Sequence, residues 1–567
     1  MKKTFIIFCV FILTFSASSI QQTVFQLQDI EIKGIVLKQG NSFFDVEKNY
    51  SQSTQSIGDF SNILRFNNDF SFKDFSGYGS LITANVGGAR SKHTLKTFNG
   101  IKLNSETSGD FDLSLIEGEL ISYISTTKGA FSSFYGSTGG GGVIEFEGKN
   151  YTSNSLGFKF GSNSYKKTFL TFMPDYNTLF FTSSKEFSDN MDFSDGRQVS
   201  HYLKHNNNNT SASVYFTDKK KYTPGSLSLP QPGNYTLDEL YLVSLEHKLN
   251  SDIDFKISLN KLENIFFDNA LSVENPTNTQ NTGFQLNYTQ PKYALTFNHE
   301  KTEGKTTQYA DTNWDGTWDT VFIYNEKKDI NSFKGELLIS DNLFSSFRFE
   351  KHDNLESFTT YNIAYKFDNF TLSYATGVTV PTFNDLYWPD TGWGGGNPAL
   401  TEEKSKNLML SYSKNNFKTS VYHNTFDNLI EWKEVPAGSF IWIPVNVSEA
   451  EITGIEIEKF FFDNKVKLTA GYEHTEDENG SSLIYREKRK GSLTYQADDY
   501  SAVTLKHTGK RKHNAAVTLP GVTTVNYFYE KDGFFFNINN VFDKKYTINY
   551  DYPDEKRTVM FGVTRNI

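Results

Sequence analysis

The strongest constraint on this chain is an alternation of apolar and polar side chains that recurs between Tyr151 and Ile567. Three clear runs are Phe255–Asn260, Phe284–Tyr288 and Val466–Tyr472. Successive residues of a β-strand point to opposite faces, so each run has one apolar and one polar face. A wall with lipid on one side and water on the other needs this arrangement. The pattern therefore predicts a transmembrane β-barrel.

Composition favours the same fold over a large soluble β protein. The chain has 52 Phe and 31 Tyr, an aromatic fraction of 16%, yet its mean hydropathy is -0.50. After Phe15 no apolar stretch reaches the about 20 residues that a spanning helix requires. A chain of this kind can be integral to a membrane only as a closed barrel. Residues 151–567 divided among about 22 strands leave about 19 residues for each strand with its connection.

The N-terminus has the features of a secretory signal peptide over residues 1–19. Lys2 and Lys3 precede an apolar run from Phe5 to Phe15, and small residues follow. The only cysteine, Cys9, lies inside this run and is expected to leave with it. The mature chain then has no thiol, which excludes disulfides, thiolate metal sites and cysteine nucleophiles.

Residues 85–149 have a different rhythm, with short β-prone runs separated by glycine-bearing turns. The runs are 93–98, 120–126 and 143–147. Four consecutive glycines, Gly139 to Gly142, accept positive φ and allow another backbone to come close. This stretch predicts a small mixed sheet with tight connections.

The order of short motifs in this stretch resembles the plug domain of TonB-dependent outer-membrane receptors. The motifs are Asn99-Gly100, Asp112-Leu113-Ser114, Lys128-Gly129, Tyr135-Gly136 and Gly141-Gly142-Val143-Ile144. The segment Ile121 to Thr126 departs from the family because it lacks the usual Glu and Arg. Near the C-terminus, Asn539 to Tyr546 resembles the family's ending, where we expect a periplasmic turn before the closing strand.

The resemblance implies an all-β transmembrane barrel of about 22 antiparallel strands, with an N-terminal α+β plug domain inside the lumen. It divides the chain into a signal peptide (1–19), a TonB-box segment (20–40), a plug domain (41–150) and the barrel (151–567). It also implies an integral protein of the cell outer membrane, surrounded by outer-membrane lipid and energised by TonB in the periplasm.

The TonB-box segment contains an alternating stretch that is ready to form a strand. Such a strand could add to the edge of a partner's sheet through main-chain hydrogen bonds. By position and pattern it resembles the TonB box, and the alternative is an ordinary first strand of the plug. The predicted box consists of Asp29, Ile30, Glu31, Ile32, Lys33 and Gly34.

Several further motifs resemble the cobalamin branch of the family, among them Thr107 to Ser114, Leu386-Tyr387 and Asn397-Pro398. They imply an active transporter for cobalamin or a related corrinoid. A receptor for a ferric siderophore or heme is the alternative. A passive porin would lack the plug, and an adhesin would need long external loops.

Ligand contacts are expected from plug loops 87–93 and 105–110 and from an aromatic, glycine-rich barrel loop. Binding sites are mostly apolar with a few placed polar groups. The alternatives are solvated turn residues and, for Trp388, a membrane-interface aromatic. The predicted ligand-binding residues are Arg90, Ser91, Lys92, His93, Ser108, Tyr387, Trp388 and Trp393.

Two acidic segments are candidates for structural calcium. The first has oxygen ligands at positions 1, 3, 5 and 9 around a turn glycine, as in the first nine places of an EF-hand loop, although Phe322 stands at position 12. The alternatives are an acidic hairpin turn and a solvated loop. The candidate ligands are Asp311, Asn313, Asp315 and Asp319 in the first segment, and Asp189, Asp192 and Asp195 in the second, weaker one.

Other classes of function find no support in the residues. The sequence has no H-E-x-x-H, G-x-S-x-G or P-loop motif, so we expect no enzyme activity and no redox cofactor. The net charge of -10 and the lack of a nucleic-acid module predict no nucleic-acid partner.

Overall fold

The computed structural model describes most of the chain from Glu47 onward. The described residues are 47–50, 71–74, 79–150, 152–188, 194–270, 272–310, 320–353, 355–389, 394–436, 441–446, 449–514, 517–552 and 556–567. For 47–50, 73–74, 310 and 320–322 the description covers the backbone only. The predicted signal peptide and the predicted TonB box, Asp29 to Gly34, lie outside these ranges.

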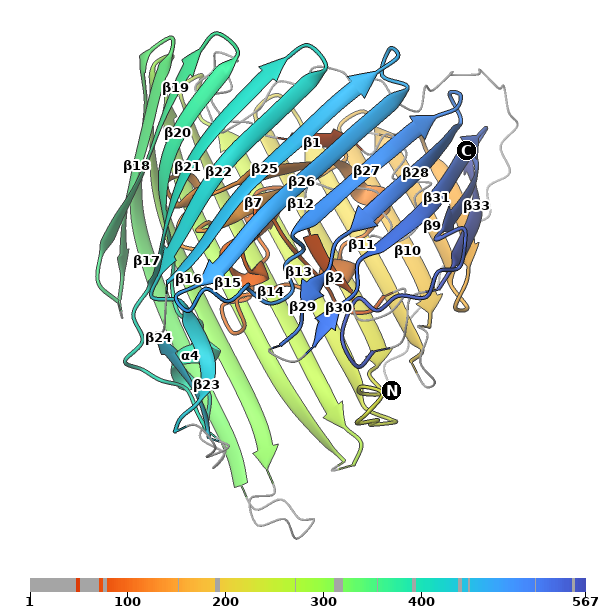
Figure 1. The fold of residues 1–567 in the computed structure, drawn as a ribbon, viewed down its shortest axis with the longest axis horizontal. Helices are drawn as coiled ribbons and strands as arrows, with labels where there is room; N and C mark the ends of the chain where they lie inside the picture. Colours follow the sequence, from red (N-terminus) through yellow and green to blue (C-terminus); the bar gives the residue numbers. More distant parts are fainter. Residues whose placement is uncertain are drawn as a thin grey trace.

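The described residues form a closed barrel of 22 strands in which every neighbouring pair is antiparallel. This confirms the predicted fold class (Figure 1). The strands are β8 (Ser155–Gly161), β9 (Lys166–Asp175), β10 (Thr178–Phe187), β11 (Gly196–Asn206), β12 (Thr210–Tyr222), β13 (Tyr235–Lys248), β14 (Ile253–Asp268), β15 (Val273–Thr289), β16 (Tyr293–Ala310), β17 (Thr320–Ser340), β18 (Leu343–His352), β19 (Phe358–Phe367), β20 (Phe370–Thr379), β21 (Glu403–Lys414), β22 (Phe417–Asp427), β25 (Ala450–Phe461), β26 (Val466–Asp477), β27 (Arg489–Gln496), β28 (Ser501–Thr508), β31 (Val522–Lys531), β32 (Phe534–Asn539) and β33 (Thr558–Asn566). The ring closes where β33 pairs with β8, from Met560 opposite Gly161 to Asn566 opposite Ser155.

The two ends of the barrel differ in the length of their connections. At one end, tight turns join the strands, as at Asp532-Gly533 between β31 and β32. Both residues have positive φ, 51° and 77°, which is the geometry that an Asp-Gly hairpin turn provides. The opposite end has long connections, including 380–402, 428–449 and 540–557. Short turns face the periplasm in such barrels and long loops face outside, so the long-loop end is extracellular.

The long connections carry small elements of their own. Helix α4 (Phe383–Tyr387) lies between β20 and β21, and hairpin β23 (Ile430–Glu434) with β24 (Trp442–Asn446) lies between β22 and β25. A second hairpin, β29 (Arg511–Lys512) with β30 (Thr518–Leu519), lies between β28 and β31. The segment Asn539 to Tyr546 begins with the last residue of β32 and continues into the connection from β32 to β33, which is on the long-loop side. The expected periplasmic turn is therefore wrong, because β33 must run back toward the short-turn end to pair antiparallel with β8.

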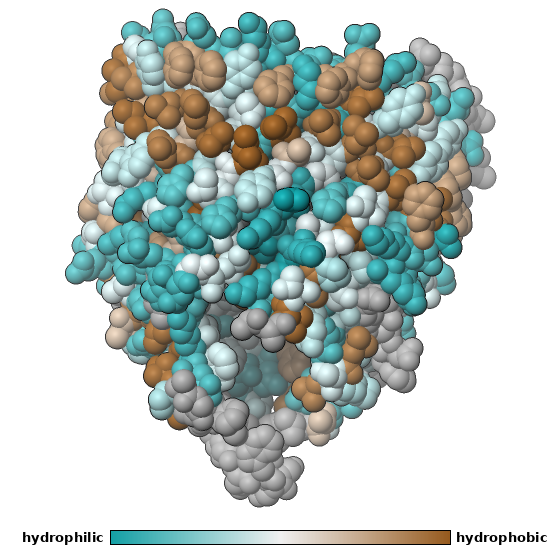
Figure 2. All heavy atoms as spheres, viewed as in Figure 1, coloured by the Kyte–Doolittle hydropathy of each residue, from teal (hydrophilic) through white to brown (hydrophobic). Residues whose placement is uncertain are grey.

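The predicted alternation of faces is present in the strands. In β14, Lys256 donates a hydrogen bond to the Asn99 carbonyl of the plug at 2.8 Å, while Ile257 is 46% exposed on the outer face. Apolar side chains gather in a band toward the short-turn end of the wall, and polar side chains cover the part nearer the long loops (Figure 2). The band is the surface that a bilayer requires. Among the described residues, no helix has the length and apolarity needed to cross a membrane.

The N-terminal residues fill the lumen with a mixed sheet and short helices, which confirms the small mixed sheet expected there (Figure 1). Within the sheet β4 and β7 are parallel, and the other pairs are antiparallel. The sheet order is β1 (Glu47–Tyr50), β6 (Ile121–Lys128), β7 (Gly142–Gly148), β4 (Thr94–Phe98) and β5 (Ile101–Lys102), accompanied by β2 (Ser71–Asp74), β3 (Ile82–Asn85), η1 (Ser91–His93), η2 (Leu113–Leu115), η3 (Gly118–Leu120) and α3 (Ser132–Tyr135).

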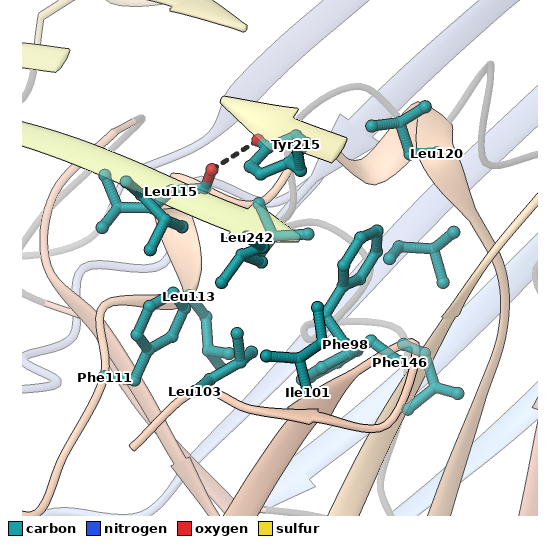
Figure 3. Packing of buried hydrophobic residues seen from close by; sticks show 14 of the residues in the cluster. Phe98, Ile101, Leu103, Phe111, Leu113, Leu115, Leu120, Phe146, Tyr215 and Leu242 are labelled. Carbon is teal, nitrogen blue, oxygen red and sulfur yellow. Dashed lines mark hydrogen bonds between the residues drawn. The ribbon is translucent and has the colours of Figure 1, made fainter. Parts of the chain in front are cut away.

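The largest apolar cluster joins the plug to the inner wall of the barrel. Phe98, Leu115 and other plug residues pack against Tyr215 and Leu242, which project inward from β12 and β13 (Figure 3). The Tyr215 hydroxyl donates to the Leu115 carbonyl at 2.6 Å. The lumen wall is thus apolar where it faces the plug core, although a water-filled lumen would leave it polar.

The glycine run allows a test of plug packing. A Cβ on Gly141 would overlap the Ala89 methyl group, whereas a Cβ on Gly139 would meet its nearest neighbour at 3.4 Å. We expect Gly141→Ala to destabilise the folded plug by about 1–3 kcal/mol, the usual cost of overpacking. Limited proteolysis across a urea titration measures this change. Gly139→Ala is the matched control, and equal urea midpoints for the two variants would contradict the packing argument.

Candidate ligand-binding site and plug interface

Two plug loops reach the long-loop end of the barrel and meet its external connections there. The Phe383 amide donates to the Glu106 carbonyl at 2.8 Å, and the Asn384 amide donates to the Thr107 carbonyl at 3.1 Å. Helix α4 is therefore seated on plug loop 105–110. Its first turn is fixed by a reciprocal cap in which Thr382 and Asp385 bond to each other's backbone amides.

The other plug loop, 87–93, contacts hairpin β23–β24. Arg90 donates to the Ile430 carbonyl at 3.3 Å and forms an ion pair with Glu431. Lys92 lies 3.3 Å from the same carbonyl and 3.2 Å from Glu403. Both predicted ligand-binding cations are half-buried, and each already has a carboxylate partner.

His93 lies inside the plug–barrel interface instead of on the outer surface. Its side chain is buried, with Nε2 2.7 Å from Glu403 Oε2 and its ring stacked on Phe426 at 5.5 Å. Burial lowers the pKa of His93 below its usual value, and the attraction of Glu403 only partly opposes this effect. His93 therefore contributes a contact between the plug and β21, and its place among the ligand-binding residues stays a prediction.

Ser91 and Ser108 have contrasting surroundings. Ser91 Oγ lies 2.7 Å from Asp110 Oδ1 and accepts a hydrogen bond from Lys96 at 2.7 Å. Lys96 is fully buried, and burial lowers its pKa despite the adjacent Asp110 carboxylate. Ser108 is exposed at the tip of its loop, where its oxygen accepts only a weak bond from the Asp110 amide at 3.4 Å. Of the two serines, Ser108 is the exposed one.

The aromatic residues near α4 extend over the hairpin. Tyr387 and Trp388 are partly exposed at the end of α4. Trp432 is 37% exposed and donates from Nε1 to Asp385 at 3.0 Å, and Trp442 is 49% exposed. We call Tyr387, Trp388, Trp432 and Trp442 the aromatic surface. Predicted Trp393 lies outside the described residues. Trp432 and Trp442 are absent from the sequence prediction because both stand in a β-prone segment without the glycine run that marked the predicted aromatic loop.

The calcium predictions fall mostly on residues that the structure does not describe. Asp311, Asn313, Asp315 and Asp319 are outside the described ranges, as are Asp189 and Asp192. Asp195 is described and exposed beside β11. Within the described ranges, no group of three His, Cys, Asp or Glu side chains is arranged to hold a metal ion.

Two buried carboxylates of the plug meet lysines of the barrel. Glu119 lies 2.8 Å from Lys159 and 2.5 Å from Lys167, and Lys167 also pairs with Glu117. Lys185 is 3.6 Å from Glu117, whose oxygen also accepts a hydrogen bond from a β11 serine and a β11 glutamine. We call Glu117, Glu119, Lys159, Lys167 and Lys185 the lysine–glutamate cluster. Its two glutamates lie just before Ile121 to Thr126 in the sequence, the segment that lacks the family's usual charges.

A second ionic group ties the plug to β25–β27. Lys128 pairs with Glu456, which also lies 3.0 Å from Lys490. Glu473 accepts a hydrogen bond from the Tyr422 hydroxyl at 2.7 Å and lies 3.7 Å from Lys490. Lys128 therefore forms an ion pair across the plug–barrel interface.

The fold and its contacts define a plugged outer-membrane β-barrel with an external surface built jointly by plug loops and barrel loops. Residues 134–541 match the family described as TonB dependent receptor-like, beta-barrel, and residues 46–143 match the TonB-dependent Receptor Plug Domain. The chain belongs to the TonB-dependent receptor family, whose members are receptors and transporters. It is an integral protein of the outer membrane.

Two curated relatives share low identity over most of the chain. A vitamin B12 transporter BtuB of Vibrio vulnificus is 24% identical, with 83% of this chain and 82% of the relative covered. A vitamin B12 transporter BtuB of Photobacterium profundum is 25% identical, with coverages of 85% and 86%.

Solved structures share the fold. The siderophore receptor PirA from Acinetobacter baumannii has a TM-score of 0.70 at 16% identity, covering 92% of this chain and 98% of that one. The ferric enterobactin receptor PfeA from Pseudomonas aeruginosa has a TM-score of 0.73 at 15% identity, with coverages of 92% and 99%. Identity at this level shows the fold alone.

The lysine–glutamate cluster predicts how acid affects plug docking. Burial alone would raise the pKa of Glu117, but the ammonium groups of Lys167 and Lys185 outweigh it and lower the pKa to about 2 from its ordinary value of 4.5. A carboxyl group whose pKa is lower in the folded protein than in the unfolded chain stabilises the fold at any pH above its pKa in the unfolded chain. This stabilisation is lost as the pH falls through the pKa of the group in the folded protein. We expect the plug to become more sensitive to protease as the pH falls from about 4.5 to 2. At pH 7, Glu117→Gln should lower the free energy of plug docking by about 3 kcal/mol.

The control for this prediction is Glu451→Gln, which removes a carboxylate from the exposed outer face of β25. Its protease sensitivity should follow that of the natural chain at every pH. If Glu117→Gln were released no more readily than Glu451→Gln at pH 7, the cluster would not hold the plug.

Proposed function

We propose that this receptor binds cobalamin or a related corrinoid at its outer face and delivers it to the periplasm. The observation that carries the proposal is that both relatives named as vitamin B12 transporters match more than four fifths of this chain and of their own length. A ferric siderophore or heme is the alternative ligand. The plug fills the lumen, which a passive porin would not need.

The aromatic surface supports a large, flat ligand. Trp432 and Trp442 project from a hairpin that the connection after α4 holds in place. The Gly394 backbone packs so closely on the Trp442 backbone that a Cβ on Gly394 would overlap it, and Asn397 donates to the Pro444 carbonyl at 3.0 Å. Rigid aromatic side chains provide contact area at low entropic cost. Exposed Ser108 on the plug adds a polar contact beside this apolar area.

The charges beside the aromatic surface bear on the choice between ligands. Arg90 and Lys92 pair with Glu431 and Glu403, so neither offers an uncompensated positive charge at the surface. Recognition of a strongly anionic ferric complex would require these pairs to break, which would deprive the buried Glu403 and the half-buried Glu431 of these cations. Stacking on the aromatic surface requires no such change, which favours the corrinoid.

Transport requires energy from the periplasmic side. We infer that Asp29 to Gly34 pairs with TonB as an added strand, and that pulling on this segment moves the plug within the barrel. We also propose that calcium orders the external loop from Asp311 to Asp319, on the basis of its EF-hand-like spacing. Calcium would there be structural and take no part in chemistry.

The ligand is tested by titrating purified protein with cyanocobalamin and with a panel of ferric siderophores, each with and without calcium. We expect saturable binding of cyanocobalamin that calcium strengthens, and a loss of about 1–3 kcal/mol in Trp442→Ala from lost stacking. Tyr176→Ala is the control, because Tyr176 is fully exposed at the opposite end of the barrel. Binding of a siderophore without binding of cyanocobalamin would reverse the assignment.

The energy-coupling segment is tested by deleting Asp29 to Gly34. We expect the deletion to leave ligand affinity unchanged, because the segment contains none of the predicted ligand-binding residues. We expect it to abolish uptake by cells, because the segment provides the proposed contact with TonB. Uptake of radiolabelled ligand measures the effect. Uptake equal to that of the natural chain would remove the assignment of this segment.

A further inference from the structure

Four segments around the aromatic surface are joined in a closed circuit of contacts, which we call the external ring. They are plug loop 87–93, plug loop 105–110, α4 and hairpin β23–β24. Backbone amides of α4 donate to two carbonyls of loop 105–110, and Trp432 of the hairpin donates to Asp385 of α4 at 3.0 Å. Two further links close the ring, one from the hairpin to loop 87–93 and one between the two plug loops.

The link between the hairpin and loop 87–93 is centred on Glu403, the first residue of β21. Its carboxylate accepts a hydrogen bond from the Ile430 amide at 2.5 Å. The same carboxylate lies 3.2 Å from Nζ of Lys92 and 2.7 Å from Nε2 of His93. The Ile430 carbonyl accepts in turn from Lys92 at 3.3 Å. Both polar backbone groups of Ile430, at the start of the hairpin, therefore take part in this link.

The link between the two plug loops is centred on Lys96 of β4. Its ammonium group donates to the carbonyl and the hydroxyl of Ser91 at 2.8 Å and 2.7 Å, and to Asp110 at 2.8 Å. Ser91 Oγ also donates to Asp110 at 2.7 Å. Because Ser91 belongs to one loop and Asp110 to the other, Lys96 ties the two loops together at one point.

Both central residues are shielded from anything bound at the outer surface. Glu403 is 2% exposed and Lys96 is 0% exposed. Removing one partner of a buried charge pair leaves the other charge buried and uncompensated, which is costly. Each of the four segments is fixed by both of its neighbours, so cutting one link loosens all of them and cutting a second adds little.

We propose that Glu403 and Lys96 are positioning residues for ligand binding, because they close the external ring and the closed ring holds the aromatic surface in its binding arrangement. This inference rests on the proposed function, since it assigns part of the affinity for cobalamin to two residues that do not reach the ligand. The four segments then act as one cooperative unit. Residues of one network are not additive, so the losses of affinity on cutting two links do not multiply.

The test titrates cyanocobalamin against the purified natural chain, Glu403→Gln, Lys96→Met and the double variant. We expect each single variant to bind about tenfold more weakly or worse, because a buried charge loses its partner. The double variant should bind no more than about threefold more weakly than the poorer single variant. Two independent links would instead multiply to a loss of about a hundredfold or more.

A second readout does not depend on the ligand. All six tryptophans of the chain lie between positions 314 and 442, and three of them, Trp388, Trp432 and Trp442, belong to the aromatic surface. Acrylamide quenching of tryptophan fluorescence therefore follows the exposure of that surface. We expect stronger quenching in both single variants than in the natural chain, because the hairpin loses its fixed position. A role of the two residues in plug stability alone would leave the quenching constant unchanged.

The matched controls are Glu402→Gln and Lys404→Met, which make the same side-chain changes on either side of Glu403. Glu402 and Lys404 pair with each other at 3.2 Å. Affinity and quenching in both controls should equal those of the natural chain. Heat-modifiable electrophoretic mobility reports the folded barrel. Asp110→Asn cuts the same link as Lys96→Met at a half-buried residue, so it replaces that variant if Lys96→Met does not fold.

The outcomes separate this inference from the transport function. Cyanocobalamin binding of equal affinity in all chains, unchanged quenching in both single variants, or losses that multiply in the double variant would overturn the positioning role and leave the corrinoid assignment intact. Absent cyanocobalamin binding in the natural chain, together with stronger quenching in the single variants, would overturn the corrinoid assignment and support the external ring.

Discussion

The pairing of β33 with β8 is the interaction on which the rest of the structure depends. It joins the last strand of the chain to the first strand of the wall and leaves the barrel without a free edge. In hydrocarbon no water is available to bond exposed amides and carbonyls, so an open edge would be very costly. Closure also fixes which face of each strand looks inward, and thereby which side chains meet the plug.

The interior combines two kinds of contact with different physical consequences. Aromatic and aliphatic residues of β12 and β13 pack on the plug core, and this burial stabilises the docked position. The lysine–glutamate cluster and the Lys128–Glu456 pair add buried ion pairs, whose attraction is offset by the cost of removing charges from water. Ion pairs of this kind specify position strongly while contributing modest net stability. The proposed transport needs a plug that stays in place and can still be moved, and such an interface is compatible with that proposal.

The external surface depends on the same joint construction. Loop 105–110 of the plug supports α4, and loop 87–93 holds hairpin β23–β24. The barrel loops that carry Trp388 and Trp432 are thus positioned by the domain that transport is proposed to move. On the proposed function, a displacement of the plug would remove the support of the aromatic surface and so link ligand release to plug movement.

Sequence reasoning predicted some of the lumen contacts but little of their chemistry. The alternation in β14 identified Lys256 and Asn260 as inward-facing, because a period of two fixes the face of every residue once one is known. It did not show that Glu117 and Glu119 would meet Lys159 and Lys167, since those partners are about 40 to 50 positions apart and lie on different domains. It also placed the turn at Asn539 on the wrong side of the membrane, because the motif carries no information about strand direction.

The sequence by itself determined the alternating, lipid-facing wall and the small glycine-punctuated sheet, since both depend on periodicity and turn chemistry within short stretches. The number of about 22 strands and the plug inside the lumen came from the resemblance to the receptor family. Only the tertiary structure decided that His93 is buried against Glu403 and that Trp432 and Trp442 join the external surface. These features arise where distant segments meet, 310 residues apart for His93 and Glu403 and 47 apart for Asp385 and Trp432, and local pattern does not encode which distant side chain will stand opposite.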